Sequence, residues 1–275
     1  MSLLNAALRP VFDLLLAPFA AWPPIVPVTL VSLVVSILML VVFKHTSNQD
    51  ALAAVKRKIH AGLFEIRLFN DDLRAILRAQ SEILRTNLTY LRLTLWPMVF
   101  LLPPLVLIIA QLQFHYGYEG LRPGERALLS VDLEPGAGGG ARPPAKLEVP
   151  AGLRAEAGDV WVKAESQLLW RLVAEREGDY ELGLDVAGAH LTKTVRVTPK
   201  AVRLSPVRVD RGFVSQLLYP AEPPLPAGSP VRAVRLSYPE REVSVLGHSM
   251  NWMIPFFVLS IVFAFALRGL FKVTI

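Results

Sequence analysis

Three long apolar segments divide the chain. Residues 24–43, 96–114 and 252–267 are nearly free of charged side chains. The first two reach the roughly 20 residues that a helix needs to cross a bilayer. The third reaches that length only when residues 268–271 are included, and Arg268 can then extend its head group to the membrane interface. The pattern predicts an integral membrane protein with transmembrane helices at 23–44, 96–116 and 249–275, the last including a short tail.

Residues 1–22 alternate apolar patches with Asn5, Arg9 and Asp13. The segment lacks the layout of a cleavable signal peptide, because no basic region leads directly into a short apolar core. A short amphipathic helix in the membrane interface is expected, with Trp22 as an aromatic anchor. The alternative is that this helix packs against the bundle.

Between the first two spans, residues 45–95 show coiled-coil spacing. One unbroken helix would extend roughly 65 Å from the membrane, yet its end must return to begin the second span. The chain is therefore expected to turn at Asn70, Asp71 and Asp72, whose side chains can cap a new helix. The result is a helical hairpin whose two seam positions are Leu52, Ile59, Ile66 and Leu73, and Val55, Gly62, Phe69, Ile76 and Ile83.

The pattern changes after Tyr118 to short alternating strands separated by turn residues, which predicts an all-β sandwich over residues 117–248. The run from Gly178 to Leu184 resembles the sixth strand of immunoglobulin-like domains, in which a tyrosine, here Tyr180, pins the preceding corner. The usual cysteine of that strand is replaced by Leu182. The expected strands are 127–133, 146–149, 160–164, 168–174, 180–186 and 191–197, followed by a hairpin-like return of 231–237 with 242–246.

The net charge of +6 is concentrated in one region. Residues 117–248 hold 17 basic and 17 acidic side chains, whereas residues 44–92 hold nine basic and five acidic ones. Basic residues near span ends are retained in the cytoplasm. This places the hairpin and the C-terminus inside, and the N-terminus and the β domain outside. Nucleic-acid binding by the basic region is disfavoured, because the same region carries acids and a helical apolar stripe.

Polar residues within the spans admit two interpretations. Thr29, Ser32 and Ser36 lie on or near one face of the first span, and the second span ends with Gln111 and Gln113. Hydroxylated residues are common where transmembrane helices pack. The same residues could instead line a polar groove, opened where prolines kink the second span.

Catalytic chemistry is not indicated. The five histidines are scattered, with no pair at metal-ligand spacing, and the chain has no cysteine. A capped turn explains the adjacent carboxylates Asp71 and Asp72 without acid/base work. We expect no enzyme activity, cofactor, metal or small-molecule substrate.

The order of these elements resembles the core of the YidC/Oxa/Get superfamily of membrane protein insertases. The closest variants are the minimal three-span members, such as the third subunit of the endoplasmic reticulum membrane complex and the archaeal YidC-like proteins. The matching stretch is residues 24–114, especially Phe43, Lys44 and Asn48 at the span exit and the Trp96-Pro97-Met98 start of the second span. The third span matches by position, at about residues 250–272.

The resemblance implies that the protein gives polar segments of client proteins a hydrophilic groove through the membrane. A wet, thinned region lowers the cost of moving charged residues through hydrocarbon. Carried onto this chain, the groove would be lined by Thr29, Ser32, Ser36, Gln111 and Asn251. Its cytoplasmic mouth and the hairpin would present Lys44, Lys56, Arg57, Lys58, Arg92 and Arg268 to nascent clients or the ribosome.

The family pattern is not matched throughout. Many members carry a basic residue within the first core span, and this chain has none between Trp22 and Lys44. An alternative is a non-catalytic scaffold or complex subunit that binds an extracytoplasmic protein partner through its β domain. A sensor of the cell envelope is a weaker option, since little chain remains for an output module. The composition, rich in Ala, Leu, Arg and Pro, fits a GC-rich bacterium and hence its inner membrane.

Overall fold

The computed structural model describes residues 1–68, 73–134, 142–245 and 247–273. Three helices are long and apolar enough to cross a membrane: α2 (Ile25–Thr46), the segment Ile76–Tyr116 within α4 (Leu73–Tyr116), and α6 (Met253–Phe271). The chain is thus a multi-pass membrane protein, as the apolar segments predict. The prolines Pro97, Pro103 and Pro104 lie inside α4 without ending it.

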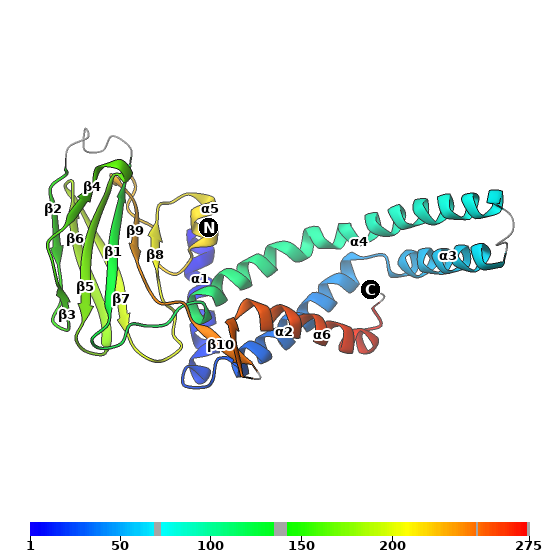
Figure 1. The fold of residues 1–275 in the computed structure, drawn as a ribbon, viewed down its shortest axis with the longest axis horizontal. Coiled ribbons are helices and arrows are strands. Elements are labelled where there is room, and N and C mark those ends of the chain that lie inside the picture. The colour runs from blue at the N-terminus through cyan, green and yellow to red at the C-terminus, as the bar shows by residue number, and fades with distance from the viewer. Residues whose placement is uncertain (69–72, 135–141, 246, 274–275) are drawn as a thin grey trace. The chain divides into compact units, whose positions relative to one another are not determined.

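The chain forms two compact units, which we describe separately (Figure 1). The helical unit comprises Val28–Val106 and Met253–Ile275, and the β unit comprises Met1–Pro27 and Leu107–Trp252. In the helical unit, α3 (Gln49–Leu68) follows α2 and precedes α4. The turn expected at Asn70, Asp71 and Asp72 lies outside the described residues, as does Phe69 of the expected seam.

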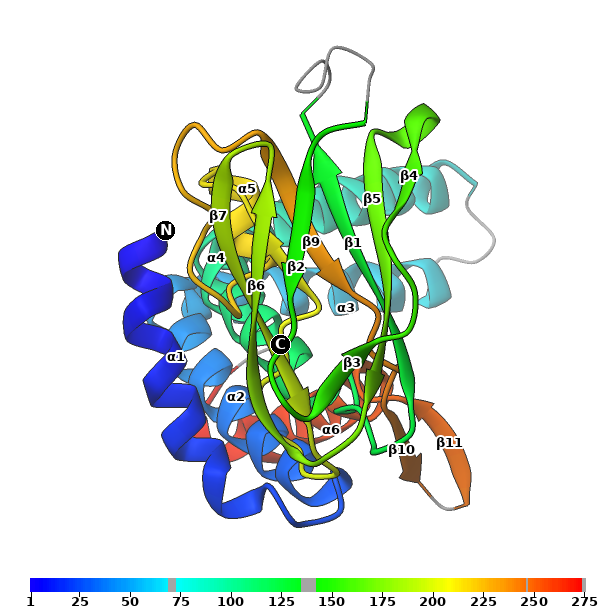
Figure 2. The ribbon, with the colours of Figure 1, turned by 90° about the vertical axis from the view of Figure 1, so that its left-hand side faces the viewer.

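The β unit contains antiparallel sheets, in agreement with the prediction of a β-rich domain. The larger sheet has the order β3-β5-β1-β9-β8, with β4 also paired to β5, and the second has the order β2-β6-β7. Its strands are β1 (Arg126–Leu133), β2 (Ala145–Glu148), β3 (Leu153–Ala155), β4 (Val160–Val162), β5 (Gln167–Ala174), β6 (Gly178–Val186), β7 (Ala189–Val197), β8 (Val207–Val209) and β9 (Val231–Leu236). Figure 2 shows most strands lying along roughly the same axis, with neighbouring strands pointing in opposite directions.

The two sheets share one hydrophobic core. Alternate residues along β1, β6 and β7 are buried, including Leu129, Val131, Leu182, Leu184 and Val195. This period of two is what a strand needs to turn one face inward. The core therefore follows directly from the alternating pattern in the sequence.

Tyr180 on β6 contacts both the corner before its own strand and the turn at Gly152. Its hydroxyl donates a hydrogen bond to the carbonyl oxygen of Arg176, 2.9 Å away, as expected for a tyrosine that pins a corner. The ring covers Gly152, where an added Cβ would come within 2.2 Å of the Tyr180 hydroxyl. Gly152 also has a φ of +115°, so a side chain is disfavoured there on both counts.

The expected hairpin of residues 231–237 with 242–246 is wrong. Strand β9 pairs with β1 and β8, whereas β10 (Glu242–Val245) pairs with β11 (His248–Asn251). Strands β3, β8 and β11, and the short helix α5 (Phe213–Leu218), were not expected from the sequence. Leu246 and the glycine run Gly138–Gly140 lie outside the described residues.

The N-terminal helix α1 (Ser2–Leu16), followed by a single 3₁₀ turn η1 (Ala17–Phe19), belongs to the β unit. Figure 1 shows α1 running across the last turns of α4, and Asp13 of α1 contacts His115 in the last turn of α4. A helix is therefore present where the sequence predicts one.

Candidate functional site

The helical unit carries the most distinctive surface, and it begins where α2 gives way to α3. The Asn48 side-chain oxygen accepts a hydrogen bond from the Ala51 backbone N–H at 2.9 Å, which caps the start of α3. Asp50 in the first turn adds a negative charge at the positive end of the helix dipole. The cap determines where the helical arm starts after the first span.

The two arms contact each other at some of the residues expected in the seam. Leu52 is buried, and a Cβ added to Gly62 would lie 2.7 Å from Cγ1 of Ile83, whereas the buried Ala79 was not among the expected seam residues. The ammonium of Lys56 on α3 lies 5.8 Å from the centre of the Tyr90 ring on α4, a cation–π distance. Gly62 thus permits a close approach of the arms at Ile83.

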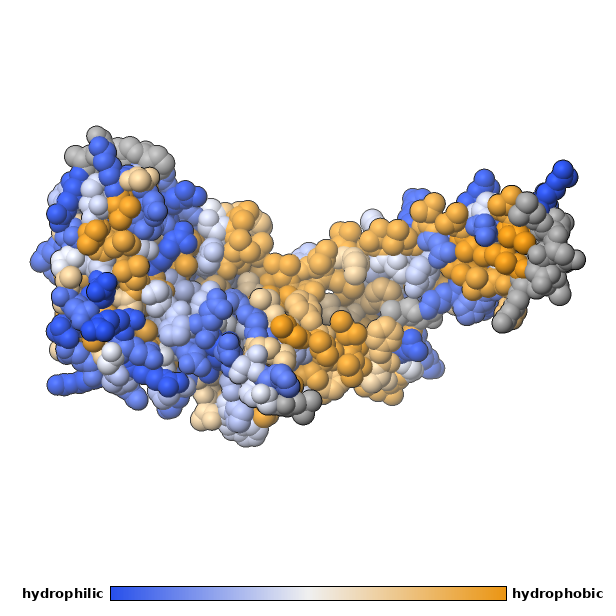
Figure 3. Space-filling view, in the orientation of Figure 1, coloured by the Kyte–Doolittle hydropathy of each residue, from blue (hydrophilic) through white to orange (hydrophobic). Residues whose placement is uncertain are grey.

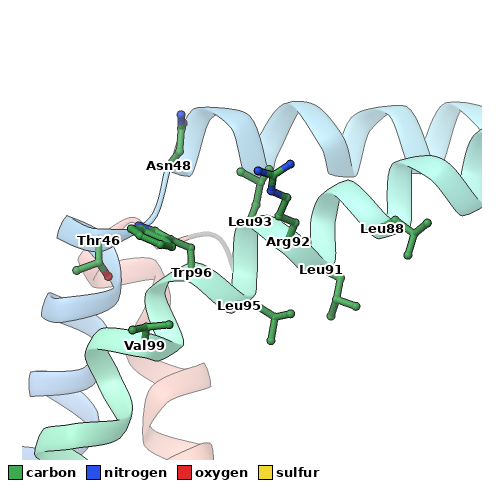
Figure 4. Close-up of a pocket in the computed structure, with 9 residues that line it drawn as sticks. All are labelled: Thr46, Asn48, Leu88, Leu91, Arg92, Leu93, Leu95, Trp96 and Val99. Carbon is green, nitrogen blue, oxygen red and sulfur yellow. The ribbon is translucent and has the colours of Figure 1, made fainter.

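A groove of about 730 Å³ lies where the arms meet the membrane-spanning helices. It is predominantly apolar, with Arg92 as its basic residue, and Figure 4 shows Arg92 on the side of α4 that faces α3. Leu88, Leu91 and Leu95 point to another side, away from α3 (Figure 4). The lining residues are Thr46, Asn48, Leu88, Leu91, Arg92, Leu93, Leu95, Trp96 and Val99.

The leucines of this groove belong to a longer exposed stripe. The side chain of Leu88 is 67% exposed, and its neighbours at helical spacing on α4 are exposed to a similar degree. An apolar row at this spacing forms one face of a helix. We define the leucine stripe as Leu84, Leu88, Leu91, Leu95, Val99 and Leu102.

The sequence interpretation missed this stripe, although a signal was present. Leucines recur every three or four residues from Leu84 onward, one step away from the seam that includes Ile83. Only one apolar face can pack against α3, so a second row on the same helix had to remain outside. The sequence thus offered an exposed apolar face as well as a buried one.

The basic residues expected around the mouth are mostly exposed. Lys44, Arg57, Lys58, Arg92 and Arg268 have exposed side chains, and Lys56 is half-buried against Tyr90. Arg268 stacks near the Phe265 ring, 5.4 Å from its centre. A second pocket of about 370 Å³ between the arms brings Lys58 together with further charged residues; its lining is Val55, Lys58, Arg78, Ser81, Glu82, Arg85, Thr86 and Thr89.

Two of the expected groove residues hold α2 and α6 together. The Ser32 hydroxyl donates to the Phe256 carbonyl at 3.2 Å, and the Ser36 hydroxyl donates to the Ser260 carbonyl at 2.9 Å. Both serines are buried, and each shares its single hydroxyl hydrogen between this carbonyl and the carbonyl four residues earlier in α2. These contacts agree with the interpretation that Ser32 and Ser36 serve helix packing. A hydrophilic groove stays a prediction.

The other expected groove residues fall on different elements. Thr29 is half-buried on α2, and Asn251 is half-buried on β11 in the β unit. Gln111 is buried in the β unit, and its backbone carbonyl accepts a hydrogen bond from His115. The neighbouring Gln113 accepts a hydrogen bond from the Trp252 indole at 2.8 Å.

The β unit also contains a buried polar cluster that the sequence interpretation missed. Lys193 on β7 is fully buried, and its ammonium donates to Glu222 at 2.5 Å and to the Ser205 carbonyl at 2.5 Å. The second Glu222 oxygen accepts hydrogen bonds from the backbone and hydroxyl of Thr194. Burial lowers the pKa of Lys193, and Glu222 opposes that effect. Since the cluster is shielded from solvent, its role is structural.

Known proteins do not add to this description. Comparison with family models, with curated proteins and with solved structures finds no match to the chain. The fold and the site together define a class of protein. It is a multi-pass membrane protein with a helical hairpin, an exposed leucine stripe and an antiparallel β domain.

Proposed function

We propose that this protein is a membrane protein insertase or membrane chaperone of the YidC/Oxa/Get type. The observation that carries the proposal is the leucine stripe, which continues along α4 from the hairpin arm into the apolar stretch 96–116 that the sequence predicts as the second span. Exposed apolar surface costs about 25 cal/mol for each Å² left in water. A row of leucines is therefore expected to have an apolar occupant, and a client helix that slides along α4 toward the bilayer fits it.

The groove supplies the second part of this mechanism. Its apolar lining from Leu88 to Val99 suits a hydrophobic client segment, and Arg92 suits an acidic residue next to that segment. The pocket around Lys58, Arg78 and Arg85 extends the positive charge along the arms. Apolar and basic groups side by side match a membrane segment with a short acidic flank, or the ribosome that delivers it.

We infer the orientation from the basic residues that flank the spans. Lys44, Arg92 and Arg268 would face the cytoplasm, which places the hairpin and the C-terminus inside and the β domain outside. The membrane would be the inner membrane of a bacterium, and the hairpin would be a short coiled coil. The β domain would be immunoglobulin-like, as the Tyr180 corner suggests. Because the chain has no cysteine, Ser81→Cys and Gly158→Cys can report the orientation with a membrane-impermeant maleimide.

Insertion by purified protein tests the proposed activity. The full chain in vesicles of phosphatidylethanolamine and phosphatidylglycerol receives a single-span client with a short tail, and protease protection of the tail measures insertion. Leu88→Ser with Leu91→Ser should reduce insertion several-fold. Leu63→Ser with Phe64→Ser is the control, since these residues are also exposed on the hairpin but lie on α3, outside the groove and the leucine stripe.

Two results would reject the proposal. One is insertion by wild-type vesicles no greater than by empty vesicles. The other is an equal loss in the groove variant and in its control, which would trace the effect to the hairpin's general apolarity. The first result, together with a stoichiometric partner that co-purifies through residues 119–248, would favour the scaffold alternative.

A further inference from the structure

The N-terminal helix α1 is turned with its polar side toward the protein. Asn5 is buried and donates a hydrogen bond from its side chain to the Gln216 carbonyl at 2.6 Å. Two turns later, Asp13 pairs with Arg203 at 2.9 Å and with His115 at 3.0 Å. Arg203 also donates to the Arg9 carbonyl at 2.6 Å.

The opposite side of α1 is apolar and uncovered. Leu14 is 77% exposed, and Leu3, Val11 and Leu15 on the same side are also exposed. A helix on a water-soluble protein has the reverse arrangement, with apolar residues facing the core and polar residues facing water. The surroundings of this face are therefore apolar.

The short helix α5 repeats the inversion. Its buried residue is the polar Gln216, which donates to the Asp210 carbonyl at 2.9 Å, whereas Phe213, Val214 and Leu218 are exposed. A pocket of about 360 Å³ lined by Met1, Arg211, Phe213, Gln216 and Pro224 joins α5 to the start of α1. Figure 3 shows hydrophobic side chains gathered where Figure 1 draws α5 and the N-terminal end of α1.

The chain itself places α1 near the membrane surface. Residues 17–24 link α1 to α2, and eight residues span less than about 30 Å even when extended. This linker carries the exposed Trp22, a residue type enriched at membrane interfaces. The contact of Asp13 with His115 further ties α1 to the last turn of the candidate span in α4.

We propose that α1 and α5 together form a lipid-contacting surface seated in the leaflet on the β-domain side of the membrane. Leu3, Val11, Leu14 and Leu15 of α1 and Phe213, Val214 and Leu218 of α5 enter the boundary between head groups and acyl chains. The exposed Arg211 beside α5 lies at the level of the phosphates. This contact holds the β domain against the bilayer independently of the hairpin and its function.

A fluorescent probe in the cysteine-free chain tests this surface. The full-length variants Val214→Cys and Val160→Cys carry an environment-sensitive label in vesicles of phosphatidylethanolamine and phosphatidylglycerol that contain a nitroxide on the acyl chain. The two valines are matched, because they are 62% and 57% exposed and both lie on the β unit, on α5 and β4 respectively. The label at 214 should shift to shorter wavelength and be quenched several-fold more than that at 160, and Leu14→Cys should follow 214.

Two outcomes would overturn the proposal. Equal quenching at 214 and 160, with equal access to a water-soluble quencher, means that no lipid contacts α5. Shielding at 214 that persists in detergent and grows with protein concentration assigns the surface to a second copy of the chain instead. A protease-digestion pattern like that of the wild type shows that each labelled variant is folded.

Discussion

The ammonium of Lys193 lies 2.5 Å from a carboxylate oxygen of Glu222 in the interior of the β unit. Lys193 comes from β7, whereas Glu222 comes from the proline-rich segment between α5 and β9. Ser205 donates a hydrogen bond to the same Glu222 oxygen at 2.5 Å. The cluster thus links the irregular segment between α5 and β9 to the second sheet. It holds that segment in one conformation, although the segment has few regular backbone hydrogen bonds.

Removal of one member of this pair should destabilise the β unit strongly. Glu222→Leu leaves a buried ammonium without its counter-charge, which costs about 3–5 kcal/mol in comparable pairs. The double variant Lys193→Met with Glu222→Leu should lose less, because no uncompensated charge remains. Urea unfolding of the full chain in detergent, followed by near-ultraviolet circular dichroism, measures both.

The exposed pair of Lys146 and Glu148 provides the control for this experiment. Lys146→Met should leave the unfolding midpoint unchanged, since a solvated ion pair contributes little. If the double variant proves less stable than the single one, the attraction between Lys193 and Glu222 outweighs the cost of burying them, and our account of the cluster is wrong.

Acid should weaken the wild-type β unit more steeply than a Glu222→Gln variant. Burial by itself raises the pKa of the Glu222 carboxyl, but Lys193, Ser205 and Thr194 outweigh it and hold the pKa below the usual 4.5. A carboxyl whose pKa is lowered by folding contributes stability above its unfolded-state pKa, and this contribution is lost as the pH falls through the folded-state pKa. Unfolding midpoints measured from pH 6 down to about pH 3 should therefore diverge in slope below about pH 4.5. Parallel slopes would show that Glu222 is not ionised in the folded protein.

The sequence predicted the β unit well where alternation is regular. Strands β1, β5, β6 and β7 lie within two residues of their expected bounds, because one buried face imposes a period of two. The same alternation puts Lys193 in phase with the inward-facing Leu191 and Val195, so the buried lysine had a readable signal. Its partner Glu222 had none, since it belongs to an irregular segment whose path is fixed by tertiary contacts.

Long-range pairing was beyond the reach of the sequence pattern. Strand β9 pairs with β1, about a hundred residues earlier, and a hydrophobic period says nothing about which strand is a neighbour. The three-residue strands β3 and β8 are too short to show any period. At the candidate site, the heptads pointed to the approach of Gly62 to Ile83, but the coiled coil stays a prediction. The leucine stripe and the serine contacts of α2 could not be predicted, because they depend on which helix faces are covered.

Gly62→Leu should force the arms of the hairpin apart. A Cβ at this position would already lie 2.7 Å from Cγ1 of Ile83, so a larger side chain has no room until Ile83 moves. Ala61→Leu is the control, because Ala61 is exposed one residue earlier on the same arm. Limited trypsin digestion at Lys56, Arg57 and Lys58 reports opening, and cleavage should rise several-fold for Gly62→Leu alone.

A compensating substitution sharpens this test of the seam. Ile83→Ala removes the atoms that a side chain at position 62 would meet, so Gly62→Leu with Ile83→Ala should regain much of the protection. Protection that stays lost in the double variant would mean that residues 62 and 83 do not face each other. Gly62→Ala alone combines a smaller overlap with a helix-propensity gain of up to about 1 kcal/mol, and its cleavage should lie between the extremes.

Loss of the Arg203 guanidinium should loosen α1. Arg203 bonds to both Asp13 and the Arg9 carbonyl, and a hydrogen bond to a charged group contributes about 1.5–3 kcal/mol. Asp13 is half exposed, so we expect Arg203→Gln to cost about 1–2 kcal/mol, which opens the helix about 5–30-fold more often. Chymotrypsin cleavage after Phe12, the residue before Asp13 on α1, measures the opening. Arg122→Gln, at the exposed pair with Glu119, is the control and should not change cleavage.

Helix packing at Ser36 can be separated from a polar lining role by size. The Ser36 hydroxyl donates to the Ser260 carbonyl of α6 at 2.9 Å, and such bonds between membrane helices contribute about 0.6 kcal/mol on average. Ser36→Ala should therefore lower the thermal midpoint in detergent only slightly. Ser36→Leu should lower it much more, since the larger side chain forces α2 and α6 apart at a buried contact. Val34→Leu enlarges an exposed side chain two residues away on α2 and should have no effect. If Ser36→Leu matches Val34→Leu, then position 36 faces open space, and the hydrophilic groove regains one of its expected residues.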